Sequence, residues 1–244
     1  MSRDIRDLAA FYHAPLGQMA RRMILRRVRA IWPDMRGRRL LGYGYAVPYL
    51  RGFAGAERVV AAMPATMGVM AWPPARNAAL LCAEDALPFA DVFFDRILVV
   101  HGLEGAEQLR PLLRQLWRVL APEGKLLIVA PNRASLWAQL DISPFGHGRP
   151  FSRRELEDLL RDVLFEPLRF ECALYAPPVQ SRALRGSGAG WERLGARLLP
   201  RSGGVHVVEA SKSLYAAAGR ARAKPAEQPV QQAAGGDLTG FTPS

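Results

Sequence analysis

The sequence predicts an α/β fold: a Rossmann-like, seven-stranded, mostly parallel and doubly wound sheet with an added N-terminal helix. The first observation is that short apolar runs alternate with stretches long enough for a crossover connection, as in parallel sheets covered by helices. The second is that these runs are apolar throughout, which is typical of strands buried on both faces. A chain of 244 residues, 50% of them hydrophobic, is long enough to bury one large core of this kind.

The expected strands begin after residue 38 and alternate with expected helices. The strands cover residues 39–43, 58–62, 78–82, 96–100, 126–130, 168–174 and 205–210. Apolar residues recur at helical spacing in 15–32 and in 106–120, which predicts two amphipathic helices. Ser152, with Glu155 three residues later, has the spacing of a capping box and predicts the start of another helix. A short helix is expected at 191–199.

The composition divides the chain into three parts. Residues 1–35 are expected to form a helical cap, and residues 36–215 the domain that contains the sheet. Residues 216–244 are rich in Ala, Gln, Pro and Gly and show no periodicity. Such a segment has too little apolar surface to offset the entropy of ordering it, so we expect a disordered tail.

The charge is strongly positive and concentrated near the N-terminus. The net charge is +11, and residues 1–39 hold ten arginines against three aspartates. A nucleic acid or another anionic surface could bind this basic N-terminal helix. A solvated helix face would show the same pattern, because arginine dominates the whole chain and lysine occurs only three times.

Cysteine usage and hydropathy suggest where the protein works. Cys82 and Cys172 are too few for a disulfide framework or a thiolate zinc site, so we expect no metal. The N-terminus lacks the pattern of a secretory signal, and no apolar run reaches the ~20 residues of a transmembrane helix. These observations predict a cytoplasmic protein without a membrane span.

The first strand ends in a candidate ligand loop. Gly42, Tyr43, Gly44 and Ala46 follow the apolar run directly, and alternate glycines allow a ligand to approach the backbone. In open parallel sheets, ligands bind beyond the carboxyl ends of the strands, where the strand order reverses. An ordinary tight turn would also show Gly-x-Gly.

A second region carries more specific motifs. Two acidic residues precede Leu87-Pro88-Phe89, Phe94-Asp95 begins a strand, and Arg118-Val119-Leu120-x-Pro122-x-Gly124 precedes the next strand. Over about residues 80–132 this succession resembles the second half of class I S-adenosylmethionine-dependent methyltransferases of the type-11 branch. The resemblance implies the seven-stranded fold, S-adenosylmethionine as cofactor and transfer of its methyl group to an acceptor, expected to be a small molecule.

The chain departs from the family where the cofactor is usually anchored. The family has an acidic residue at the position of Gly42 and two further glycines where Ala46 and Pro48 stand. Met63 occupies the place of the acidic residue that accepts the ribose hydroxyls. Loss of such charged hydrogen bonds weakens binding on the order of a hundredfold or more. We expect the segment 42–46 to cradle the cofactor nonetheless, next to Met63.

The resemblance also assigns candidate roles near the ends of the third and fourth strands. Glu84 and Asp85 lie near the position that contacts adenine, although an exposed acidic turn would explain them equally well. His101 ends the fourth strand, where an imidazole could act as a base near neutral pH or bond to a loop carbonyl. Glu104 could pair with His101 or simply begin the next helix. The stretch 145–152 resembles the family's acceptor-pocket border, although an ordinary connection in which Pro150 and Phe151 pack against the following helix would also explain it.

The sequence is therefore compatible with two alternative functions. The first is a divergent methyltransferase that acts on an unknown acceptor, with His101 as the candidate catalytic residue. The alternative is a catalytically inactive protein that keeps the methyltransferase fold for interaction or regulation, which the absence of carboxylates at Gly42 and Met63 favours.

Overall fold

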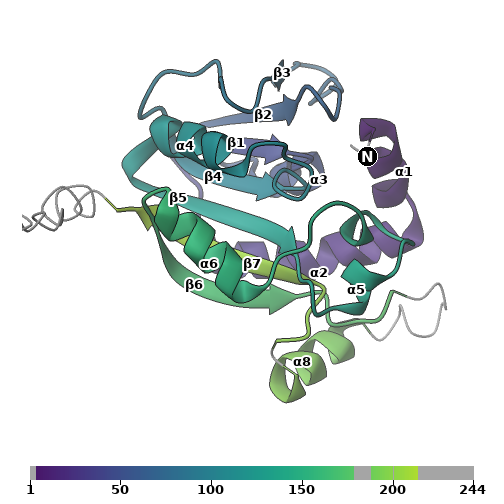
Figure 1. Ribbon diagram of the computed structural model, residues 1–244. Helices are drawn as coiled ribbons and strands as arrows, with labels where there is room; N and C mark the ends of the chain where they lie inside the picture. Colours follow the sequence, from purple (N-terminus) through teal and green to yellow (C-terminus); the bar gives the residue numbers. More distant parts are fainter. Residues whose placement is uncertain (1–3, 179–187, 200, 214–244) are drawn as a thin grey trace, which may run out of the picture.

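The computed structural model describes residues 4–178, 188–199 and 201–213, and its centre is one sheet of seven strands (Figure 1). The strands are β1 (Arg39–Gly44), β2 (Arg58–Pro64), β3 (Ala79–Cys82), β4 (Phe94–Val100), β5 (Leu120–Pro131), β6 (Phe165–Ala173) and β7 (Val205–Lys212). Their order is β3-β2-β1-β4-β5-β7-β6, and only β7 runs antiparallel to its neighbours. The predicted fold class is confirmed, and all seven predicted strands are present. The predicted tail 216–244 lies outside the described residues.

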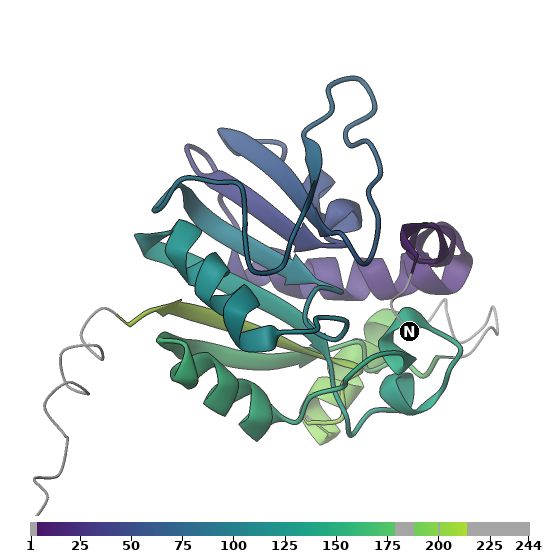
Figure 2. The ribbon, with the colours of Figure 1, turned by 45° about the horizontal axis from the view of Figure 1, so that its top comes forward.

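Helices cover both faces of the sheet (Figure 2). α4 (Leu109–Val119) and α6 (Arg153–Asp162) cover one face, and α2 (Pro15–Ile31) covers the other. The shorter elements are α3 (Val47–Leu50), η1 (Arg51–Phe53), α5 (Leu136–Gln139), η2 (Pro144–Gly146) and α8 (Gly188–Leu198). Successive strand residues alternate between the two cores, so that Leu40 packs on the α2 side and Leu41 on the α4 side.

The N-terminal segment forms two helices where the sequence predicts one. α1 (Ile5–His13) precedes α2, and Pro15 occupies the first turn of α2, where its missing N–H costs nothing. Asp4 caps α1 by accepting a hydrogen bond from the backbone of Arg6. Figure 1 shows α1 beyond the arrowheads of β1 and β2, so this helix lies at the carboxyl edge of the sheet.

Two local predictions are met in detail. The hydroxyl of Ser152 accepts a hydrogen bond from the backbone N–H of Glu155, and the carboxylate of Glu155 accepts one from the backbone N–H of Ser152. These two bonds complete the predicted capping box at the start of α6. α4 presents Leu112, Leu113 and Leu116 to the core, as its apolar stripe predicts. No helix in the described ranges combines the length and apolarity that a membrane-spanning segment needs.

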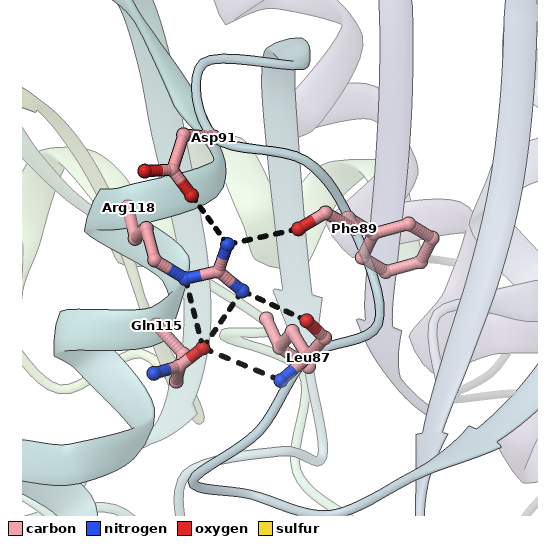
Figure 3. A network of polar contacts seen from close by, with 5 residues as sticks. All are labelled: Leu87, Phe89, Asp91, Gln115 and Arg118. Atoms are coloured by element: carbon pink, nitrogen blue, oxygen red, sulfur yellow. Dashed lines mark hydrogen bonds and ion pairs between the residues drawn. The ribbon is translucent and has the colours of Figure 1, made fainter.

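Arg118 explains why two of the sequence motifs occur together (Figure 3). Its guanidinium donates to the carbonyls of Leu87 and Phe89 and pairs with Asp91. Gln115, one turn earlier on α4, accepts from Arg118 and from the backbone N–H of Leu87. The loop between β3 and β4 is thereby attached to α4, and it carries the acidic residues toward the carboxyl edge.

His206 connects β7 to the segment before α6. Its Nε2 donates to the carbonyl of Phe151 at 3.1 Å, so Nδ1 can accept from the thiol of Cys172, which lies 3.6 Å away. The side chain is buried, and burial lowers the pKa of His206 to about 4.

This pKa predicts a loss of stability in weak acid. In the unfolded chain a histidine has a pKa of about 6.5 and binds a proton in weak acid, whereas His206 in the folded chain stays neutral. The free energy of unfolding therefore falls as the pH decreases from about 6.5 toward 4. At pH 5 the loss is about 2 kcal/mol. Urea unfolding of wild type and His206→Gln at pH 7.5 and pH 5 measures it. The variant should lose less stability on acidification, whereas His13→Gln, at an exposed position, should behave as wild type. Equal losses in all three proteins would contradict this assignment.

Candidate functional site

The candidate site lies where the order of the strands reverses. β1 is hydrogen-bonded to β2 on one side and to β4 on the other, so the switch point of the sheet lies between β1 and β4. A cavity of about 40 Å³ lies at the carboxyl edge there. Its walls include Leu8 of α1, Met67 after β2, Glu84 after β3, and His101 and Glu104 after β4. Together with residues 144–148, five separate segments therefore converge on one small space.

Three buried side chains form a hydrogen-bonded chain beside this cavity. Nε2 of His101 lies 2.8 Å from the hydroxyl of Tyr12, and Nδ1 lies 2.8 Å from Oε1 of Glu104. An ionised Glu104 can only accept, so Nδ1 carries the proton and Nε2 accepts from Tyr12. The Tyr12 hydroxyl also lies 2.9 Å from that of Tyr49. The arrangement orients His101 with a free electron pair on Nε2 once Tyr12 moves away.

The surroundings keep Tyr12 as a neutral hydroxyl. Burial raises the pKa of Tyr12 well above its ordinary value, and the neighbouring Tyr49 and the charge of Glu104 raise it further. Tyr12 is therefore a donor to His101 and not a charged partner of it.

The backbone of His101 is in the left-handed region. Its φ is +53°, which is uncommon for a residue other than glycine and costs of order 1–3 kcal/mol. Such strain is found where the surrounding structure holds a residue in place for a function. Here it turns the imidazole out of the strand and toward α1.

Glu104 has one oxygen without a partner. Oε1 bonds to His101, while Oε2 is buried and has no hydrogen-bond partner among the described residues. The side chain is 8% exposed and forms part of the cavity wall. A buried acceptor of this kind is costly unless a donor or a cation satisfies it. Glu104 therefore contributes a carboxylate to the cavity wall, and its buried second oxygen is left without a donor or a cation among the described residues.

α1 covers the cavity. The backbone N–H of Ile5 donates to the carbonyl of Met67 at 3.0 Å, Leu8 forms part of the wall, and Tyr12 bonds to His101. The 40 Å³ that remains can hold a few water molecules, whereas pockets for larger ligands measure roughly 300–1,000 Å³. A ligand of that size needs α1 to move.

The predicted glycine loop is tightly packed. A Cβ on Gly42 would lie 2.8 Å from the methyl carbons of Leu50 and 2.9 Å from the Cβ of Ala46, so α3 fills the space of the family's carboxylate. Gly44 has φ +79° and sits against the carbonyl of Val100, which only glycine permits. Tyr43 and Ala46 are buried in the two cores.

Met63, in β2, is also buried in the core and does not line the cavity. The cofactor-binding role of this loop and of Met63 stays a prediction.

The other predicted residues divide between the cavity and the surface. His101 and Glu84 line the cavity, and the carboxylate of Glu84 accepts from the backbone N–H of Glu107 at 3.0 Å. Asp85 is exposed and lies outside the lining. The predicted pair of His101 and Glu104 is present. His147, in the predicted acceptor-pocket border, is also part of the wall.

Sequence reasoning missed Tyr12. It lies in α1, which carries no motif, and only its spacing from Ile5 and Leu8 on one helix face could have indicated a buried position. Its contact with His101 spans 89 positions of the chain. No local pattern predicts such a contact.

Part of the N-terminal positive charge is neutralised within the fold. Arg27 pairs with Glu171, and Arg39 pairs with Asp95. Arg22 and Arg26 of α2 are exposed. Binding of a nucleic acid or an anionic surface to this helix stays a prediction.

The comparisons with known proteins agree with this geometry. Residues 41–128 match the family model described as Methyltransferase domain (Methyltransf_11). Over this segment the chain is similar to the methyltransferase domains of that family. The matched segment runs from β1 to β5 and contains His101 and Glu104, whereas α1 and Tyr12 precede it. No curated protein sequence matches the chain significantly.

Solved methyltransferase structures share the fold. An S-adenosylmethionine-dependent methyltransferase of Thermotoga maritima has 18% identity and a TM-score of 0.57, over 85% of this chain and 96% of that one. One from Mesorhizobium loti has 16% identity and a TM-score of 0.54, over 76% and 96%. The 1,6-didemethyltoxoflavin-N1-methyltransferase of Burkholderia thailandensis, with bound 1,6-didemethyltoxoflavin and S-adenosylhomocysteine, has 17% identity and a TM-score of 0.50, over 85% and 86%.

The packing around Gly42 predicts that any side chain introduced at this position lowers the stability of the fold. Gly42→Ala should lower the free energy of unfolding by about 1–3 kcal/mol, because the added methyl overpacks Leu50 and Ala46. Chemical denaturation measures the change. Gly105→Ala is the matched control, since nothing lies within 4 Å of its added Cβ. A Gly42→Ala variant as stable as Gly105→Ala would show that α3 leaves room at this position.

Proposed function

We propose that the protein is an S-adenosylmethionine-dependent methyltransferase whose cofactor site is the cavity beside His101 and Glu104. The observation that carries the proposal is the buried, unpartnered Oε2 of Glu104 at the switch point of the sheet. The cofactor carries a sulfonium and an ammonium group, and either would satisfy this oxygen. The methyltransferase domain model that matches residues 41–128 supports methyl transfer as the class of reaction.

The charge of the residues that line the cavity fits the cofactor. The cavity is too small for the cofactor unless α1 moves outward. Glu104 would hold the cationic end, and Glu84, which also lines the cavity, would contact another part of the cofactor. The bound cofactor supplies an already activated methyl group, so this chain needs to provide position and, for an acidic acceptor, a base. His101, oriented by Glu104, is the candidate base through Nε2.

Tyr12 is a positioning residue in this proposal. Its hydroxyl occupies Nε2 of His101 in the covered state, so the base becomes available when α1 withdraws. A single outward movement of α1 would therefore both open the cavity and free Nε2 of His101.

The alternative is a catalytically inactive protein with the same fold. The packing of Leu50 against Gly42 and the cavity of only 40 Å³ favour it. Calorimetric titration with S-adenosylmethionine separates the two functions. Saturable binding supports the enzyme, and the absence of heat at millimolar ligand would support the alternative.

Glu104→Gln tests the role of the buried carboxylate. The amide oxygen can still accept from His101, but the negative charge is gone, so affinity for S-adenosylmethionine should fall about tenfold or more. Glu107→Gln, three residues later and exposed, is the matched control and should bind as wild type. Equal affinities of Glu104→Gln and wild type would remove Glu104 from the cofactor site. Thermal melting verifies that both variants fold.

Tyr12→Phe tests the proposed cover. The change removes the hydrogen bonds to His101 and Tyr49 that hold α1 in place, so the open state becomes more populated. S-adenosylmethionine should bind up to about tenfold more tightly in calorimetry, because each lost bond is worth roughly 0.5–1.5 kcal/mol. Tyr49→Phe removes only one of these bonds and should have a smaller effect. Weaker binding by Tyr12→Phe would mean that α1 helps to build the site.

A further inference from the structure

A second cavity has Tyr12 in its wall. It measures about 380 Å³, within the range of roughly 300–1,000 Å³ that is typical of ligand pockets. The helices α1 and α2 contribute Tyr12 and Arg21, the turn after β1 contributes Tyr45, and η1 begins with Arg51. The loop between β2 and β3 closes it with Trp72. Tyr12 lines this second cavity and is hydrogen-bonded to His101, which lines the first, so one contact connects the walls of the two cavities.

The walls of the second cavity are aromatic. The rings of Tyr12 and Tyr45 lie 5.7 Å apart, and Tyr45 and Trp72 are buried. Aromatic walls favour flat, apolar ligands, because ring faces and edges stack on them. The indole Nε1 of Trp72 is buried and has no hydrogen-bond partner among the described residues.

The charge of the lining is positive. Arg21 and Arg51 belong to it, and none of its residues is an aspartate or glutamate. Arg21 donates through Nε to the carbonyl of Pro48, which orients its guanidinium. Within the described part of the chain neither arginine pairs with a carboxylate. Guanidinium groups bind carboxylates and phosphates through paired hydrogen bonds.

We propose that the second cavity binds the methyl acceptor and that the acceptor is a planar aromatic anion. The proposal rests on the proposed function. The ring would lie against Tyr45 and Trp72, and the anionic group would bind Arg21 and Arg51. Transfer would break the methyl–sulfur bond, leave its electron pair on sulfur as a thioether, and bond the methyl carbon to a nucleophilic oxygen or nitrogen of the acceptor. The proton of that atom would pass to Nε2 of His101.

A pair of probes that differ only in charge tests this binding site. 2-Naphthoate and the neutral 2-naphthamide have the same ring and nearly the same shape. Fluorescence or calorimetric titration of the full chain without cofactor should show naphthoate binding at least tenfold more tightly than naphthamide. Equal affinities, or no saturable binding of naphthoate, would overturn the proposal.

Substitution of Arg51 tests whether naphthoate binds in the second cavity. Arg51→Gln should weaken naphthoate binding about tenfold and leave naphthamide binding unchanged, because only the anion needs the guanidinium. Arg22→Gln removes an exposed arginine of α2 that does not line the cavity, and it should bind naphthoate as wild type. Equal losses in both variants would indicate general attraction by the basic surface and overturn the proposal.

The same variants distinguish this proposal from the proposed function. S-adenosylmethionine affinity is measured in parallel and should not change in Arg51→Gln. If Arg51→Gln weakens S-adenosylmethionine and not naphthoate, the second cavity belongs to the cofactor and the acceptor assignment is overturned. If naphthoate binds as expected while S-adenosylmethionine never binds, the proposed function fails and the aromatic-anion site stands alone.

Discussion

A buried carboxylate is the constraint on which the site depends. Glu104 lies at the carboxyl edge of the sheet with one oxygen on His101 and the other without a partner among the described residues. An acid in such surroundings is stable only when neighbours orient and compensate it. His101 does this in part, with a left-handed backbone, and Tyr12 completes the chain from α1. The second oxygen stays unsatisfied within the described part of the chain, and in the proposed function the cationic end of the cofactor supplies its partner.

The first turn of the sheet is packed too closely to hold a side chain at Gly42. In the resembling family, the position of Gly42 carries an acid, but here Leu50 and Ala46 occupy the space that its side chain would need. Gly44 keeps the close approach to the strand end at Val100. The negative charge at this edge therefore comes from the segment after β4 and from Glu84, and not from the ends of β1 and β2. The second cavity, which Tyr12 lines, carries the opposite charge through Arg21 and Arg51.

The fold could be predicted from the sequence because its signals are local. Apolar runs and helical spacing predict β1 to β7 and α4, and Ser152 with Glu155 predicts the start of α6 to the residue. The site was predictable only in part, since His101 and Glu84 lie in recognisable motifs and reach the cavity. Tyr12 lies in a helix without a motif. That Leu50 blocks the acidic position depends on how α3 packs against β1, which residue types and spacing do not reveal.

The most direct test is a crystal structure of the protein with S-adenosylhomocysteine, which keeps the ammonium group of the cofactor. We expect this ammonium to bind Oε2 of Glu104, Tyr12 to have left Nε2 of His101, and α1 to have moved outward. A structure in which the ligand binds elsewhere, or in which α1 and the Tyr12–His101 bond are unchanged beside it, would contradict the proposed cofactor site.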